Sequence, residues 1–267
     1  MEFNTLDDVR AFVQKVGETL DPRSRYISEL LSVVNQSEDV ADLEARLCEN
    51  SRGLRHSGPD VFQAMSLADK LRANLITNET DVFRFESADA AAIVKVMQRI
   101  QRTHLVSQDG RPVRVLVAPC SHGAEAFTVS SLALRAGVRV QINAWDVQRA
   151  CIESARTGML VTGMPFDHLA QPAIVSEEVL APISFEVVDL FEWIESDDDR
   201  LWDIVLCRNF LGYFQREVVI RLLRRLEQVL SGGGLLVLDP FAVDHFFLGP
   251  PKGMYVAEGT SSLWQRR

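Results

Sequence analysis

Apolar runs of the sequence end at several places in residues that could bind a ligand. One run is followed by Ala118 and other small residues, which let a ligand approach the backbone at the start of a helix. A second run ends in Asp146, which is well placed to accept hydrogen bonds from both hydroxyls of a ribose. A third ends in Asp189, whose carboxylate could accept from an adenine amino group while Leu190 covers the ring. These residue types suit a ligand that contains ribose and adenine.

Each of these positions also has a purely structural interpretation. Residues 118 to 127 contain one glycine and no GxGxxG pattern, so they could form an ordinary turn between a strand and a helix. Asp146 could cap the helix that follows it, a role that does not exclude ribose binding. Asp189 could be the acidic edge of a loop that continues to Asp199. His122, in the first loop, is most simply a local hydrogen-bond partner.

The stretch VLCRNFLGYF at 205 to 214 places Arg208 and Asn209 at the end of a further apolar run, with Tyr213 four residues after Asn209. The run is too apolar to be exposed, so we expect both polar side chains to be buried and to need partners. No ligand can be assigned to Arg208, for which we expect a structural role in holding the loop.

The elements that must position these loops alternate in type from about residue 88. Strands are rich in Val, Ile and Leu and are separated by single helices, which predicts an α/β fold with a doubly wound, mostly parallel sheet. In such sheets ligands bind beyond the carboxyl ends of the strands, near the point where the strand order reverses. The predicted strands are 113–119, 140–146, 183–189, 202–209 and 235–241, and the predicted helices are 88–101, 124–137, 148–158 and 216–230.

Residues 1 to 75 show only helical patterns. A capping signal at Thr5 precedes apolar residues at helical spacing, and further helical patterns cover 23–35, 39–50 and 60–75. We therefore expect an N-terminal helical domain or cap over 1–75 and a second, ligand-binding domain over 76–267.

The composition excludes several classes of protein. A net charge of −9 disfavours nucleic acid and anionic membrane as main partners, although a local basic patch is compatible with it. The four cysteines are widely spaced and form no CxxC pair, which predicts reduced thiols, no bound metal and a cytoplasmic protein. No stretch approaches the roughly 18 apolar residues of a membrane span, so we expect no membrane insertion.

Taken in order, the loops resemble the chemotaxis receptor methyltransferase family, which uses S-adenosylmethionine (SAM) to methylate receptor glutamates. The resemblance covers about residues 75 to 240, and five motifs in one order make it specific. They are TNETDVFR at 77–84, SHGAEAFT at 121–128, AWDVQRACIESARTG at 144–158, CRNFLGYF at 207–214 and LSGGGLLVL at 230–238. The last of them is expected as a glycine-rich turn before a strand.

The resemblance implies a role for individual positions. Arg84 and Tyr213 would face the transferred methyl group and its acceptor, which makes them the implied catalytic pair. The implied cofactor-binding residues are Thr80 and Arg84 against the methionine portion, Ala118 and Glu125 in the first loop, Asp146 at the ribose, Asp189 with Leu190 at the adenine, and Asn209 with Phe210 lining the pocket. The family usually has asparagine where this sequence has Asp189.

The chemistry of the implied reaction agrees with these residue types. SAM is a sulfonium with a ready leaving group, so an enzyme mainly has to align a nucleophile with the methyl and exclude water. A glutamate acceptor, with an unperturbed pKa of about 4.3, is already ionised at neutral pH and needs no general base. Arg84 and the Tyr213 hydroxyl would orient the carboxylate. The products would be a methyl ester and S-adenosylhomocysteine.

The sequence departs from the family in three places. Residues 1 to 50 do not clearly match its N-terminal helices and are acidic, and DPFAVDHF at 239–246 replaces a Gly-His-Ser-Glu motif. Between Gly158 and Asp189, the family's small β-subdomain for receptor docking is shortened. A small-molecule acceptor, with the helical cap as a lid, is therefore an alternative to a receptor glutamate, and a non-catalytic SAM-binding or scaffold protein is a further one.

Overall fold

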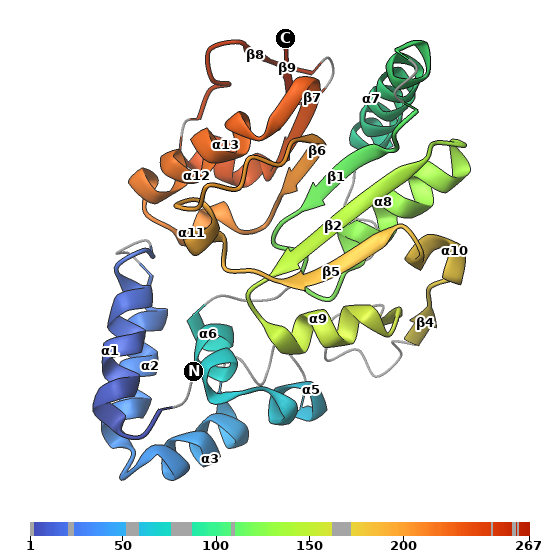
Figure 1. The fold of residues 1–267 in the computed structure, drawn as a ribbon. Helices are drawn as coiled ribbons and strands as arrows, with labels where there is room; N and C mark the ends of the chain where they lie inside the picture. The colour runs from blue at the N-terminus through green and yellow to red at the C-terminus, as the bar shows by residue number, and fades with distance from the viewer. Residues whose placement is uncertain are drawn as a thin grey trace.

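The computed structural model describes residues 3–20, 24–51, 59–75, 87–107, 110–161, 172–246, 248–257, 260 and 262–267. Its centre is a seven-stranded sheet with the order β5-β2-β1-β6-β7-β9-β8 (Figure 1). The first five strands in this order pair in parallel, whereas β9 is antiparallel to both β7 and β8. The strands are β1 Val113–Val117, β2 Val140–Asp146, β5 Ile183–Val187, β6 Trp202–Cys207, β7 Leu230–Leu238, β8 Met254–Val256 and β9 Leu263–Arg266.

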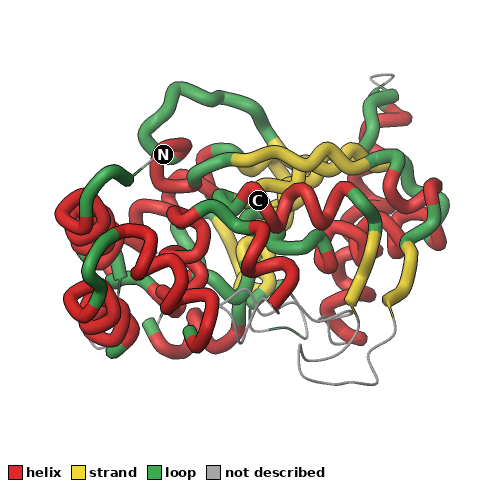
Figure 2. The backbone as a smooth tube through the Cα atoms, turned by 90° about the horizontal axis from the view of Figure 1, so that it is seen from below, coloured by secondary structure: helices red, strands yellow, loops and turns green. Residues whose placement is uncertain are grey.

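Helices cover both faces of the sheet, and Figure 2 shows the strands running through the middle with helices to either side. One face packs against α7 Ser87–Val106, α8 Ala124–Arg135, α9 Arg149–Arg156 and α10 Glu177–Leu180. The other face packs against α11 Leu190–Trp193, α12 Arg216–Gln228 and α13 Pro240–His245. This arrangement confirms the predicted doubly wound α/β fold.

Alternation along the strands explains the two layers, because successive side chains of a strand point to opposite faces. In β6, Ile204 and Leu206 belong to the hydrophobic cluster under α7 and α8, whereas Val205 and Cys207 belong to the cluster under α12. All six residues of β6 are buried. A strand buried on both faces is mostly apolar, and the one charged residue of β6, Asp203, is paired with Arg111 at 2.7 Å.

The N-terminal region is helical, as predicted, and consists of α1 Leu6–Gly17, α2 Tyr26–Gln36, α3 Val40–Asn50, α5 Pro59–Ala64 and α6 Leu67–Leu75. Figure 1 shows these helices on the side of the sheet toward which the arrows of β1 and β2 point. Val13 and Leu71 belong to the same hydrophobic cluster as Trp145 and Leu211 of the sheet region. The helices therefore share a core with the sheet and lie at the edge where the ligand-binding loops emerge. A domain boundary at 75/76 stays a prediction.

The structure corrects three local predictions. The helix expected over 60–75 is two helices, because the Ser66 hydroxyl accepts a hydrogen bond from the Asp69 N–H and starts α6 anew. The strand expected over 235–241 is β7, which begins at Leu230 and includes the glycines expected as a turn. It ends at Leu238, since Asp239 caps α13.

The interval between Gly158 and Asp189 contains a small antiparallel pair of strands, β3 Met159–Val161 and β4 Pro172–Ile174. Each strand has three residues, and 162–171 lie outside the described residues.

Within the part of the chain that the structure describes, no helix is long and apolar enough to cross a membrane.

Candidate functional site

The strand order reverses between β1 and β6. From β1 the chain proceeds to β2 and β5 on one side, and it then returns to β6 and β7 on the other. The loops after β1 and β6 therefore diverge at their carboxyl ends and form the crevice where doubly wound sheets bind ligands. The predicted site residues in the loops after β1, β2, β5 and β6 all lie along this edge of the sheet. These loops are called the first, second, third and fourth loops.

The loop after β1 is held close to the end of β2. The Cys120 N–H donates to the Trp145 carbonyl at 2.7 Å, and the Gly123 N–H donates to the Cys120 carbonyl at 2.9 Å. Gly123 has φ 88°, and a Cβ there would lie 2.8 Å from the Phe127 ring. Glycine is thus required on both conformational and steric grounds. The N-cap residue of α8, Gly123, has no side chain to bond the first N–H groups of this helix, which begins directly after the loop that follows β1.

Asp146 ties the first two loops together. One carboxylate oxygen accepts from the Ser121 N–H at 2.8 Å, and the other accepts from the Gln148 N–H at 2.9 Å. The N-cap residue of α9 is Gln148, so Asp146 organises the turn before the helix without being its cap. The side chain is almost fully buried, with 4% of the residue exposed.

Burial raises the pKa of Asp146 to about 6, although the two backbone N–H donors act in the opposite direction. Asp69 and Arg72 of α6 are close enough to influence the same pKa, the first raising it and the second lowering it. Helix α6 of the N-terminal region therefore lies within electrostatic range of Asp146. A buried carboxylate with a perturbed pKa at the carboxyl edge of such a sheet is typical of a functional site.

Arg208 has a partner across the crevice. Its guanidinium lies 3.3 Å from a carboxylate oxygen of Glu125, at the start of α8, and both side chains are largely buried, with 9% and 12% exposed. The ion pair joins the loop after β6 to the helix after β1, so it spans the switch point itself. The structural role expected for Arg208 is consistent with this pair, which the sequence did not reveal because the two residues are 83 positions apart.

Asn209 is exposed, which corrects the expectation that it is buried beside Arg208. Its φ is 51°, in the left-handed region where asparagine is favoured over most residues other than glycine. The residue type is therefore explained by the backbone turn at the end of β6. The same turn leaves the amide side chain accessible to a ligand.

Phe210 links the third and fourth loops. Its ring centroid lies 4.6 Å from that of Phe214 and 6.1 Å from that of Phe191. Phe191 follows Leu190, which is buried in the hydrophobic core, and the Phe191 N–H donates to the Asp189 carboxylate at 2.8 Å. Asp189 thus caps α11, and an aromatic cluster brings its loop next to the loop after β6.

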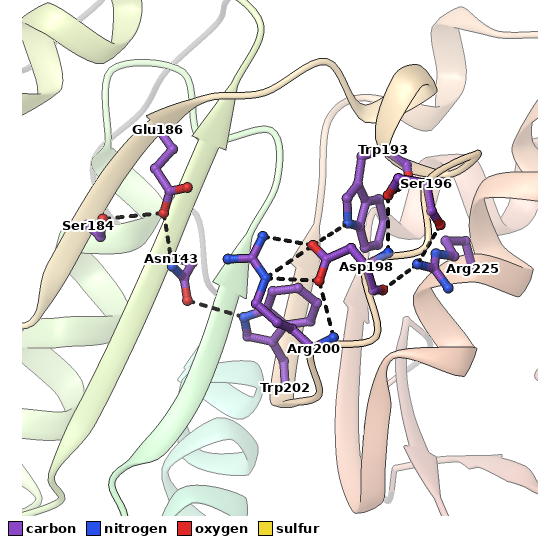
Figure 3. A network of polar contacts seen from close by, with 9 residues as sticks. All are labelled: Asn143, Ser184, Glu186, Trp193, Ser196, Asp198, Arg200, Trp202 and Arg225. Carbon is purple, nitrogen blue, oxygen red and sulfur yellow. Dashed lines mark hydrogen bonds and ion pairs between the residues drawn. The ribbon is translucent and has the colours of Figure 1, made fainter.

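A polar network holds the segment that follows Leu190 (Figure 3). The Trp193 indole N–H donates to Asp198 at 3.0 Å, and Arg200 forms several hydrogen bonds with the same carboxylate, which lowers the pKa of Asp198 to about 2. The Arg225 guanidinium donates to the Ser196 carbonyl and lies 5.2 Å from the Trp193 ring centroid. This network fixes α11 against α12 and thereby fixes the third loop.

Tyr213 is the last residue of a short 3-10 helix, η1 Leu211–Tyr213, and is half-buried. The residues after it are clamped by the N-terminal region. Phe214 forms a β-bridge with Leu20, and the Gln215 N–H donates to the Thr19 carbonyl at 3.0 Å. The N-terminal helices therefore help to position the loop that carries Tyr213, a role that the sequence did not indicate.

Two of the implied site residues, Thr80 and Arg84, lie outside the described residues. Their implied roles, and the pairing of Arg84 with Tyr213, stay predictions.

His122 has a local partner, since its Nε2 lies 3.7 Å from the Cys151 sulfur. Burial lowers the pKa of His122. Within the described ranges, no group of three or more His, Cys, Asp or Glu side chains could hold a metal ion.

The residues at this edge fit SAM. An ionised carboxylate offers about four acceptor sites, and the backbone N–H groups of Ser121 and Gln148 use two of those on Asp146, so acceptor capacity is left for ribose hydroxyls. Glu125 at the start of α8 is balanced in charge by Arg208, so the pair as a whole is neutral toward a positively charged ligand. The uncapped start of α8 and the exposed Asn209 amide add neutral donors. The assignment of each residue to one part of the cofactor stays a prediction.

Comparison with known proteins gives the family. Residues 78–239, more than half of the chain, match the family model described as CheR methyltransferase, SAM binding domain. Chemotaxis protein methyltransferase 1 of Pseudomonas aeruginosa is 27% identical over 257 residues, and the match covers 86% of both chains. The protein named "Probable biofilm formation methyltransferase WspC" of Pseudomonas putida is 25% identical over 199 residues, which are 68% of this chain and 43% of that one.

The chain thus spans less than half of the length of this WspC relative. Among solved structures, magnesium protoporphyrin IX methyltransferase (ChlM) of Synechocystis PCC 6803 with bound SAM is similar at a TM-score of 0.41 and 13% identity, covering 80% of this chain and 93% of that one. The match over 78–239 is decisive for the family, because it contains the loops after β1, β2, β5 and β6 that build the site. The chain belongs to the CheR methyltransferase family, and residues 78–239 correspond to the SAM binding domain of that family.

Proposed function

We propose that the protein transfers the methyl group of SAM to a carboxylate, and that the acceptor is a glutamate side chain of a receptor-type protein. The observation that carries this proposal is the type of group at the acceptor end of the site. The loop after β6 carries the Tyr213 hydroxyl, which is a neutral hydrogen-bond donor. Donors of this kind suit an acceptor that is already negatively charged at neutral pH.

The bound cofactor supplies a methyl group on a positively charged sulfur, which is a good leaving group. The chain has to bind the acceptor carboxylate, orient one of its oxygens and exclude water. Tyr213 would donate a hydrogen bond to the carboxylate oxygen that does not react, and the Arg84 guanidinium would pair with the negative charge of the acceptor carboxylate. Because a carboxylate releases no proton on methylation, no residue has to act as a general base.

The position of the Tyr213 loop supports this division of roles. The N-terminal region holds the residues after Tyr213 through the bridge between Leu20 and Phe214. The Glu125–Arg208 ion pair holds the start of the same loop. With both ends fixed, the Tyr213 side chain has a defined place relative to the crevice, as alignment of a nucleophile requires.

A small-molecule carboxylate is a second candidate acceptor, and one observation favours it. The described part of the interval between Gly158 and Asp189 holds a single pair of three-residue strands, β3 and β4. The resemblance assigns receptor docking to this interval, and the residues of it that the structure describes offer little surface on which a macromolecular acceptor could dock.

Incubation with methyl-labelled SAM and membranes from a chemotactic bacterium distinguishes these acceptors. We expect label on receptor-sized proteins that mild base releases as methanol, as a methyl ester requires. The Tyr213→Phe variant should show lower turnover with an unchanged dissociation constant for SAM. Base-stable label would refute transfer to a carboxylate, and absence of label from membrane proteins would refute the receptor glutamate.

A further inference from the structure

The loop after β7 lies beside the loop that carries Tyr213. Strands β6 and β7 are parallel, and Cys207 is in register with Leu238, so the residues after Leu238 emerge next to Arg208 and Asn209. Asp239 caps α13 by accepting from the Phe241 N–H at 2.9 Å. The first turn of α13 therefore lies beside the loop after β6, where the proposed function puts the acceptor.

Phe241 in this turn is unusual in its exposure. It is 65% exposed, and every other phenylalanine that the structure describes is buried or half-buried. The ring nevertheless has a defined position. A Cβ built on Gly212 would lie 3.5 Å from Cε1 of Phe241, so one edge of the ring lies against the backbone next to Tyr213.

A second aromatic ring supports Phe241 from within α13. The rings of Phe241 and His245 are stacked, with centroids 5.4 Å apart and planes 18° apart. The His245 ring in turn lies edge-on to Phe246, whose centroid is 4.8 Å away and which is buried at 6% exposure. The stack is therefore anchored in the core at one end and presents the Phe241 ring to solvent at the other.

The charges around the ring restrict what can bind on it. Asp239 and Asp244 flank Phe241 in the sequence, and Asp244 is exposed. A second carboxylate of the acceptor would be repelled here, whereas an uncharged apolar or aromatic group would bury the ring surface.

We propose that Phe241 determines acceptor specificity by binding an apolar or aromatic side chain that lies next to the methylated carboxylate in the acceptor. This inference rests on the proposed function for the identity of the reacting group. It adds a requirement that a carboxylate alone does not impose, namely an uncharged, apolar neighbour.

The experiment uses two blocked pentapeptides with labelled SAM. One is Ala-Ala-Glu-Ala-Ala, and the other has phenylalanine directly after the glutamate. We expect the wild-type protein to methylate the phenylalanine peptide with a kcat/KM about tenfold higher, a typical gain for one apolar contact. The preference should fall below about threefold in Phe241→Ala and be partly retained in Phe241→Leu.

The matched control is Val106→Ala, which removes an 84% exposed apolar side chain from the far end of α7 and should keep the preference. The dissociation constant for SAM should be the same in all variants. Equal use of the two peptides by the wild-type protein, or a preference that survives in Phe241→Ala, would overturn the proposal.

Peptide binding to the protein saturated with S-adenosylhomocysteine separates this proposal from the proposed function. If neither peptide is methylated but the phenylalanine peptide binds more tightly, and Phe241→Ala abolishes the difference, then the acceptor assignment is wrong and the role of Phe241 stands. Equal or absent binding of the two peptides would overturn the role of Phe241.

Discussion

Replacement of Asp146 by asparagine keeps the shape of the side chain and removes its charge. Burial raises the pKa of Asp146 from 3.8 to about 6. At about 1.36 kcal/mol per pKa unit, the folded state therefore disfavours the ionised form by about 3 kcal/mol relative to the unfolded state. Since the folded pKa lies above the unfolded one, this contribution to stability is complete below about pH 3.8 and is lost as the pH rises through about 6.

The free energy of unfolding of the wild type, relative to Asp146→Asn, should consequently fall by about 1 kcal/mol between pH 5 and pH 7. Independently of pH, the free energy of unfolding of the variant should be lower by roughly 1 to 3 kcal/mol, because one of the two backbone N–H groups would face an amide NH2. Urea denaturation at pH 5, 6 and 7 measures both effects. A difference between wild type and variant that is the same at each pH would refute the account of a carboxylate destabilised by burial.

The same variant tests the role of Asp146 toward the cofactor. Asparagine offers one acceptor oxygen in place of two, so SAM should bind at least about tenfold more weakly by calorimetry, and Asp146→Ala should weaken it further. Unchanged affinity in both variants would refute the assignment of Asp146 to the ribose.

Three further substitutions test how the site is held together. Glu125→Ala should destabilise the fold by about 2 to 4 kcal/mol in urea denaturation, because it leaves the largely buried Arg208 charge without this carboxylate, and a loss under about 0.5 kcal/mol would show that the pair is not structural. Gly123→Ala should lower the free energy of unfolding by about 2 kcal/mol or more, whereas Gly232→Ala, at a position with open space around it, should change it by less than about 0.5 kcal/mol. Equal melting temperatures of the two variants would contradict the close packing at Gly123. Gln215→Ala removes the side-chain hydrogen bond to the Glu18 carbonyl and should lower kcat about two- to fivefold with an unchanged SAM affinity. An unchanged kcat would show that this contact with the N-terminal region does not help to position the Tyr213 loop.

The regular elements could be predicted from the sequence where burial dictates composition. The strand at 140–146 has the predicted bounds, and the helix predicted to begin at Ala124 does begin there. Apolar periodicity carries this information because each face of the sheet needs its own core. The missed strands β8 and β9 are short and lie near the end of the chain, where no comparable apolar run marks them.

The contacts between loops could not be predicted in the same way. The partner of Arg208 is 83 residues away, and only the strand order brings Glu125 next to it. Asn209 was expected to be buried because the preceding strand is, but a left-handed turn at that residue directs the chain to the surface. The sequence predicts no site role for Phe241 because its segment departs from the family motif, although the loop after β7 lies at the same edge of the sheet as the other loops.

A crystal structure with S-adenosylhomocysteine bound tests the placement of the site most directly. We predict that the ribose hydroxyls lie within hydrogen-bonding distance of the Asp146 carboxylate, and that the sulfur faces the loop that carries Tyr213. A ribose placed away from Asp146, or a sulfur directed away from the loop after β6, would contradict the account.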